Sequence, residues 1–65
     1  MKIFMNNKEW ELDCVYFCES VKKVAYEFIS SIDFEEFTFM IDTKESFEDV
    51  LRINNAHIIK NKEGI

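Results

Sequence analysis

Residues 1–12 read MKIFMNNKEWEL, and this stretch predicts a β-hairpin at the start of the fold. Apolar and polar side chains alternate on both sides of Asn6-Asn7, as in strands with one buried face. Asparagine tolerates the positive φ that a two-residue hairpin turn requires, so the strands should cover residues 2–5 and 8–12. This register places Phe4 among polar residues, on the face turned away from the core.

The next segment, residues 13–31, has the spacing of a long amphipathic helix. Asp13 is a suitable N-cap, and apolar residues recur at helical intervals as far as Ser31. We expect the apolar stripe of this helix to cover one face of the sheet. The stripe consists of Cys14, Phe17, Cys18, Val21, Val24, Ala25, Phe28, Ile29 and Ile32.

The remainder of the chain predicts a strand, a short helix and a last strand. Residues 37–42 read FTFMID and alternate with period two, which directs Phe37, Phe39 and Ile41 inward and Thr38, Met40 and Asp42 outward. Thr43 or Ser46 should cap a helix that runs to about Asn54. In the last strand, residues 56–60, either His57 and Ile59 or Ile58 points inward.

The expected fold class is α+β, in one domain that spans residues 1–65: a hairpin, a long helix, a strand, a short helix and a strand. The sheet should be mixed or antiparallel, with the long helix on one face. This order resembles the ubiquitin-like β-grasp order, which sulfur-carrier proteins of about this length share, and MKIFMNNKEWEL is similar to their first hairpin. The resemblance implies the fold alone, because those carriers act through a C-terminal Gly-Gly and this chain ends in Lys-Glu-Gly-Ile.

Composition and charge narrow the functions to consider. No apolar run has the length of a membrane helix, no signal peptide is evident, and the two cysteines are too few for a disulfide-rich secreted domain, so we expect a cytoplasmic protein with free thiols. The net charge is −5, and residues 27–49 contain eight acidic residues and one lysine. Such a chain should repel nucleic acids and anionic membranes and attract a basic protein. The simpler interpretation of the acidic residues is a solvated surface.

No residue pattern indicates catalysis, a cofactor or a metal. Cys14 and Cys18 would share one helix face, but His57 is the single histidine, and a closed zinc site has four ligands. We therefore interpret both cysteines as buried apolar residues. A chain of this length is also not expected to form a pocket of about 300 Å³ or more, so we predict that the protein is not an enzyme.

The leading hypothesis is a non-enzymatic acidic module that occupies a basic surface of a nucleic-acid-handling enzyme. Small inhibitors of host-defence nucleases from phages or mobile elements, including anti-CRISPR-like inhibitors, and toxin-immunity proteins have this character. Phe4 and Met40 should form one apolar spot rimmed by acids. The predicted partner-binding residues are Phe4, Glu9, Glu11, Tyr16, Tyr26, Glu35, Glu36, Met40, Asp42, Glu45, Glu48 and Asp49.

Two other hypotheses belong to different functional classes. The first is a small structural homo-oligomer, possible as a homodimer, that pairs through the open face of the sheet or an edge strand. The second is a carrier or metal-binding protein that uses Cys14 and Cys18.

Overall fold

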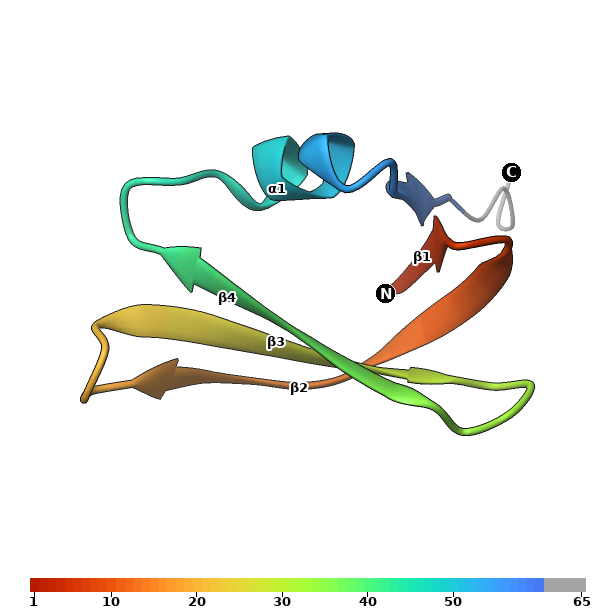
Figure 1. The fold of residues 1–65 in the computed structure, drawn as a ribbon, viewed down its shortest axis with the longest axis horizontal. Helices are drawn as coiled ribbons and strands as arrows, with labels where there is room; N and C mark the ends of the chain where they lie inside the picture. Colours follow the sequence, from red (N-terminus) through yellow and green to blue (C-terminus); the bar gives the residue numbers. More distant parts are fainter. Residues whose placement is uncertain (61–65) are drawn as a thin grey trace.

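The computed structural model describes residues 1–60, so the Lys-Glu-Gly-Ile end lies outside the described residues. The sheet is antiparallel throughout, with the strand order β4-β3-β2-β1-β5. It curls, and a helix of seven residues lies above it between the end of β4 and the start of β5 (Figure 1). The elements are β1 (Lys2–Met5), β2 (Lys8–Cys18), β3 (Lys23–Ser30), β4 (Glu36–Asp42), α1 (Phe47–Ile53) and β5 (His57–Ile59).

The predicted N-terminal hairpin is confirmed, including its register. Asn6 and Asn7 both have positive φ, 55° and 64°, as a tight two-residue turn requires. Phe4 pairs with Glu9, and their neighbours Ile3 and Trp10 pair on the opposite, buried face. The alternation of apolar and polar residues was therefore sufficient to determine this part of the sheet.

The long helix predicted for residues 13–31 is wrong. This segment forms the second half of β2, a turn and β3, which pair antiparallel. Lys22 closes the turn with a φ of 58°, and its N–H donates to the Cys18 carbonyl at 2.8 Å. The described residues consequently form a mostly β structure with one short helix, which corrects the α+β class and the long helix on one face of the sheet. Of the two sheet types expected, the antiparallel one is found, and the resemblance to the β-grasp order does not hold.

Two features explain why this segment forms strands and why the spacing of its apolar residues does not reveal them. It is rich in β-branched and aromatic residues, which favour strands over helices. It also contains a β-bulge: Leu12 pairs with Phe28 and Cys14 with Glu27, so Asp13 is an extra residue on β2. The bulge interrupts the alternation in the sequence, and the turn that follows it contains no Gly, Pro or Asn to mark a break.

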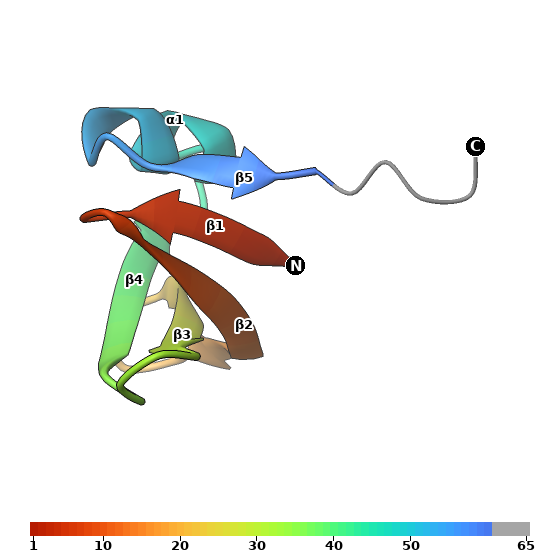
Figure 2. The ribbon, with the colours of Figure 1, turned by 90° about the vertical axis from the view of Figure 1, so that its right-hand side faces the viewer.

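The C-terminal predictions are confirmed. Phe39 and Ile41 of β4 are buried, and Met40 is exposed on the other face. Ser46 caps α1, since its hydroxyl accepts a hydrogen bond from the Asp49 N–H at 3.0 Å. The parity of the last strand, left open by the sequence, is settled by its pairing: β5 lies beside β1, and Ile58 is opposite the buried Ile3 (Figure 2).

The core fills the space inside the curled sheet, under α1. Phe28 is 1% exposed and meets Phe39 edge to face, with ring centroids 6.0 Å apart. From the helix, Phe47 stacks on Tyr26 at 4.5 Å. The buried apolar residues of the core come from β1 to β4, from α1 and from the residue just before β5: Ile3, Met5, Trp10, Phe28, Phe39, Ile41, Leu51 and Ala56. Within the described part of the chain, no helix is long and apolar enough to span a lipid bilayer.

One lysine joins two turns at the same end of the sheet. Lys8, at the start of β2, donates to Asp33 at 2.7 Å and also to Glu35, both in the turn between β3 and β4. Its ammonium lies 4.7 Å from the centroid of Trp10. The hydrogen bond from Lys8 lowers the pKa of Asp33 to about 2 and raises the pKa of Lys8 itself.

We predict that Phe28→Ala reduces the free energy of unfolding by about 3–5 kcal/mol, because it leaves a cavity at the centre of the core. A domain of this size has a total stability of roughly 3–10 kcal/mol, so the variant should be largely unfolded. Urea titration followed by circular dichroism measures the change. Phe34→Ala is the matched control, since Phe34 is 73% exposed and its loss should change stability by less than about 0.5 kcal/mol. Equal effects of the two substitutions would contradict the core described above.

We further predict that the Lys8–Asp33 ion pair makes stability depend on acid pH. The pKa of Asp33 is lower in the folded state than in the unfolded state, so its contribution is present above the ordinary carboxyl pKa of 3.8 and is lost as the pH falls through about 2. Lys8→Met should therefore lose less unfolding free energy between pH 5 and pH 2 than the parent chain does. Lys44→Met removes the same charge elsewhere and should behave like the parent. An unchanged pH profile in Lys8→Met would exclude this role.

Candidate protein-binding surface

The sheet has an inner face that packs against the core and an outer face that is open to solvent. The bulge at Asp13 decides which side chains of β2 reach the outer face. Before it, Glu9 and Glu11 point outward; after it, Cys14, Tyr16 and Cys18 do so, and Val15 and Phe17 lie on the inner side. Without the bulge, residues 14–18 would each lie on the opposite face of the sheet.

The register brings acids from three strands to the middle of the outer face. Glu11 of β2 pairs with Ile29 of β3, which pairs with Glu36 of β4, so three consecutive strands contribute to one row. Neighbouring strands lie about 4.8 Å apart, which places the Glu11 and Glu36 backbones about 10 Å from one another. We call the following five residues the acidic face: Glu9, Glu11, Asp13, Glu27 and Glu36. Lys2 of β1 pairs directly with Glu11 on this side of the sheet, and Lys23 lies at the other end of β3, where it pairs with Asp42.

Glu27 holds two neighbouring side chains on this face. It accepts a hydrogen bond from the Tyr16 hydroxyl at 2.7 Å and from the Cys14 thiol at 3.1 Å, one on each carboxylate oxygen. The hydrogen bonds lower the pKa of Glu27, mainly through Tyr16. The same bonds raise the pKa of Tyr16 to about 12 and raise the pKa of Cys14. At neutral pH the group is therefore one carboxylate with a protonated phenol and a protonated thiol, which is unsuited to nucleophilic catalysis.

The two apolar residues expected to form one spot are separate. Phe4 is partly covered by His57, with ring centroids 5.6 Å apart, and it lies beside Glu9 at the end of the outer face formed by β1 and β5. Met40 is 42% exposed and lies in the row of Tyr16 and Ala25. Seven residues of β2 separate these two rows, which is about 23 Å along a strand. The predicted single spot of Phe4 and Met40 is thus not formed, although both residues do point outward.

The remaining predicted partner-binding residues fall into three locations. Glu9, Glu11, Tyr16, Glu36 and Asp42 join Phe4 and Met40 on the outer face. Tyr26 points into the core, because β3 turns it toward Phe47 instead of placing it on a helix surface. The others lie in the turn before β4 or around the start of α1, away from the acidic face: Glu35, Glu45, Glu48 and Asp49.

Asp13, Cys14 and Glu27 were not expected to share this surface, because the predicted helix would have separated them. The atoms with which these residues could bind a metal, one carboxylate oxygen of each acid and the Cys14 Sγ, lie within 4.8 Å of one another. Cys18 does not belong to this group, so the two-cysteine metal site of the third hypothesis is not formed within one chain. Three donors also fall short of the four that close a structural zinc site.

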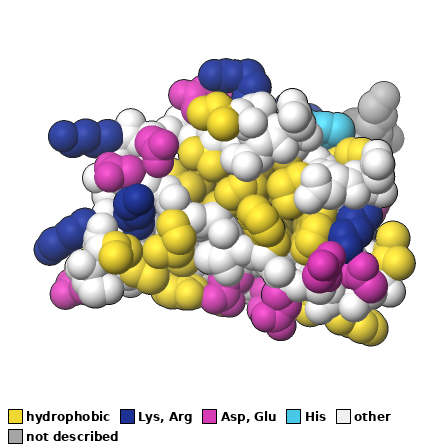
Figure 3. All heavy atoms as spheres, in the orientation of Figure 1, with side chains coloured by type: hydrophobic (Ala, Val, Ile, Leu, Met, Phe, Trp, Pro, Cys, Tyr) yellow, Lys and Arg dark blue, Asp and Glu magenta, His cyan; other side chains and the backbone are white. Residues whose placement is uncertain are grey.

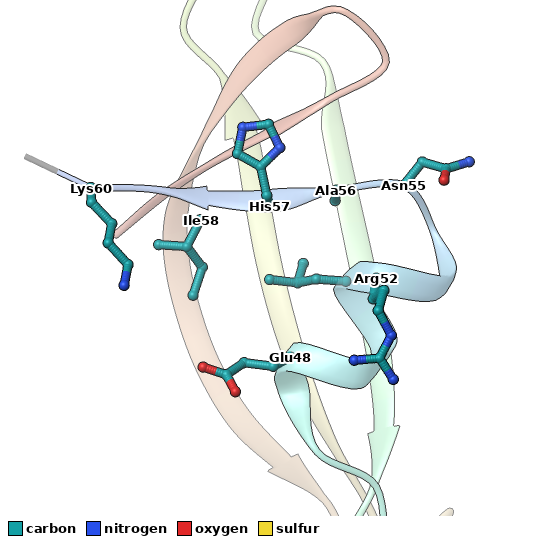
Figure 4. Close-up of a pocket in the computed structure, with 8 residues that line it drawn as sticks. Glu48, Arg52, Asn55, Ala56, His57, Ile58 and Lys60 are labelled. Carbon is teal, nitrogen blue, oxygen red and sulfur yellow. The ribbon is translucent and has the colours of Figure 1, made fainter.

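A concave region lies between α1 and β5, apart from the acidic face. It is an open hollow of about 540 Å³, larger than expected for so short a chain. Leu51, Ala56 and Ile58 form apolar parts of its lining, and Glu48 and Arg52 extend from the helix beside it (Figure 4). His57 points to the opposite side of β5 from Ile58. The described lining contains no Ser, Thr or Cys that could act as a nucleophile.

Comparison with protein-family models, with curated proteins and with solved structures finds no match to this chain.

We predict that Glu27→Gln makes Cys14 react faster with iodoacetamide at pH 8. Replacing the carboxylate with a neutral amide removes the negative charge and weakens the acceptor, and both raise the pKa of this thiol in the parent chain, so more thiolate is present in the variant. Mass spectrometry of the modified protein gives the rate at each cysteine, with Cys18 as the internal reference. The phenol of Tyr16 should also ionise below its present value of about 12 in the variant, as followed by absorbance. A Cys14 rate equal to that of the parent chain would contradict the hydrogen bond from the thiol.

Proposed function

We propose that the protein is a cytosolic, non-enzymatic binding module whose acidic face docks on a basic surface of another protein. The observation that supports this proposal is the register of β2, β3 and β4, which gathers carboxylates from separate parts of the sequence on one exposed face. Complementary charges accelerate docking and select the partner. If the acidic residues served only solubility, they would not need to lie on one face, because acids scattered over the surface give the same solubility.

The chemistry of the face suggests which class of partner it fits. Carboxylates repeat at every second residue along β2 and again across the strands, and the interspersed side chains, such as Ile29 and Tyr16, can make apolar contacts. A groove that binds the phosphates of a nucleic acid presents the opposite pattern of charge. We therefore propose a nucleic-acid-handling enzyme as the partner and occlusion of its groove as the mechanism, as in small anti-defence or immunity proteins.

The charges that are already neutralised do not contribute to this surface. Asp33 and Glu35 both bind Lys8, and Asp49 forms an ion pair with Arg52 at 2.8 Å. On the acidic face, the Glu11 carboxylate lies 3.9 Å from the N-terminal ammonium. Glu27 accepts hydrogen bonds from a thiol and a hydroxyl, which are neutral and leave its charge in place. The acidic face consequently keeps most of its negative charge available to a partner.

We predict that Glu11→Lys/Glu36→Lys abolishes capture of basic proteins. The immobilised chain is exposed to the heparin-binding fraction of a cell lysate, and retained proteins are eluted with salt or with duplex DNA. The parent chain should retain a protein that duplex DNA displaces, and the variant should retain at most about one tenth as much.

The matched control is Glu19→Lys/Glu48→Lys, which lies off the acidic face. Each Glu→Lys change adds two charges, so both double variants move the net charge from −5 to −1. The control should retain the protein at close to the parental level. Equal losses in the two variants would show that only net charge matters, and a retained protein that duplex DNA does not displace would exclude occlusion of a nucleic-acid groove.

A further inference from the structure

The second half of β2 has a neighbouring strand on one side only. β1 pairs with β2 from Lys8 to Glu11, and the bond from the Leu12 N–H to the Met1 carbonyl, 2.9 Å, is the last across this pair. On the other side, β3 continues beside β2 as far as Cys18. Among the described residues, nothing pairs with the outer side of residues 14–18, which we call the free edge of β2. Such an edge presents unpaired N–H and C=O groups to another chain.

The side chains of the free edge are apolar on both faces. On the inner side, Val15 and Phe17 are each 47% exposed, because α1 does not extend over this end of the sheet. On the outer side, Tyr16 is 44% exposed. Hydrophobic side chains gather at the end of the molecule where the turn joins β2 to β3, at the lower left of Figure 3, apart from those at the centre of the molecule. The free edge contains no charged residue and no proline, the features that normally protect an edge strand from pairing.

We propose that the free edge binds the free edge of a second copy of this chain, as antiparallel strands related by a twofold axis at Tyr16. An axis perpendicular to the sheet keeps the inner faces of both copies on the same side. Residues that pair across the axis must then share a face, so the axis has to pass through a residue and not between two residues. An axis at either end of the free edge, Cys14 or Cys18, would pair most of its residues with residues outside 14–18. Three positions remain: Val15, Tyr16 and Phe17.

The side chains select one of these three registers. With the axis at Val15, Phe17 would lie opposite the partner's Asp13. With the axis at Phe17, Val15 would lie opposite the partner's Glu19. With the axis at Tyr16, Val15 lies opposite the partner's Phe17 on the inner face, and this contact occurs twice. The register at Tyr16 is thus the one that pairs apolar residues with apolar residues.

The same register places Cys14 opposite the partner's Cys18 on the outer face. Directly opposed residues in antiparallel strands have Cα atoms about 4.5–5.5 Å apart, which is within the range of a disulfide. Within one chain the two cysteines are four residues apart on a strand, about 13 Å, so they cannot join one another. A disulfide between Cys14 and the partner's Cys18 is therefore expected only when the axis passes through Tyr16.

Charge also favours the antiparallel arrangement. The acidic end of the free edge, with Asp13 and Glu27, comes beside the hairpin end of the other copy, which carries the partner's Lys22 and the partner's Lys23. In the joined sheet, the row on the outer face runs from Glu27 and Cys14 to the partner's Cys18 and the partner's Lys23. One like-charge pair occurs at each end, between Asp13 and the partner's Glu19, where both side chains are exposed to solvent.

Sedimentation velocity across a range of micromolar concentrations tests the association, with three variants of the inner face. Val15→Glu and Phe17→Lys each place a charge opposite an apolar residue, and each should weaken the dimer by about tenfold or more. The double variant Val15→Glu/Phe17→Lys places a carboxylate opposite an ammonium twice and should recover part of the affinity. Both residues are half exposed, so each variant should fold, and circular dichroism at low concentration checks this.

Cysteine cross-linking tests the register independently. Diamide accepts the two protons and two electrons that each disulfide releases. The parent chain should form a covalent dimer, whereas Cys14→Ser and Cys18→Ser should each remain largely monomeric when oxidised alone, because identical cysteines of the two copies lie about 13 Å apart along the strands. A mixture of the two variants should cross-link about tenfold faster than either alone.

Three results would overturn the proposal. The first is a monomer at every concentration. The second is a dimer that the double variant weakens as much as the two single variants together. The third is equal cross-linking of the single-cysteine variants alone and in mixture. Because Val15 and Phe17 lie on the inner side and the acidic face lies on the outer side, these variants leave the proposed capture of basic proteins intact, and the two proposals can fail separately.

Discussion

The β-bulge at Asp13 is the constraint on which the surface of this protein depends. One extra residue on β2 reverses the parity of the strand, so that Cys14 and Tyr16 join Glu27 on the outer face. The same reversal turns Val15 and Phe17 to the inner side, beyond the region that α1 covers. The hydrogen-bonded carboxylate and the exposed apolar edge therefore have a common origin in one local irregularity of the backbone.

The two proposed interactions use different parts of the same sheet. The acidic face lies across the middle of the outer surface, where carboxylates from three strands meet. The free edge of β2 lies at one side, where backbone groups and apolar side chains are available. Pairing of two copies at the free edge would extend the outer face into a continuous sheet that carries two acidic faces. Such a surface would offer a basic partner two sites on one rigid support.

Local patterns were sufficient where the partner of a segment lies close in the sequence. Asn6-Asn7 and the alternation around it determine the first hairpin and its register, and Ser46 determines the start of α1. The helix predicted for residues 13–31 is wrong because apolar residues on both faces of β2 and β3 imitate helical spacing. Ala25, for example, is fully buried on the outer face, where Tyr16 and Met40 flank it in the register.

The sequence by itself determined the aromatic content, the negative charge, the first hairpin, the capped helix and the inward residues of β4. The tertiary structure alone decided that Asp13 is a bulge, that Glu11, Glu27 and Glu36 share a face, and that the second half of β2 has a free edge. The physical reason is the range of the interactions. Turns and caps are set by neighbours within a few residues, whereas the face of a strand residue is set by pairing with another strand, and one inserted residue reverses it.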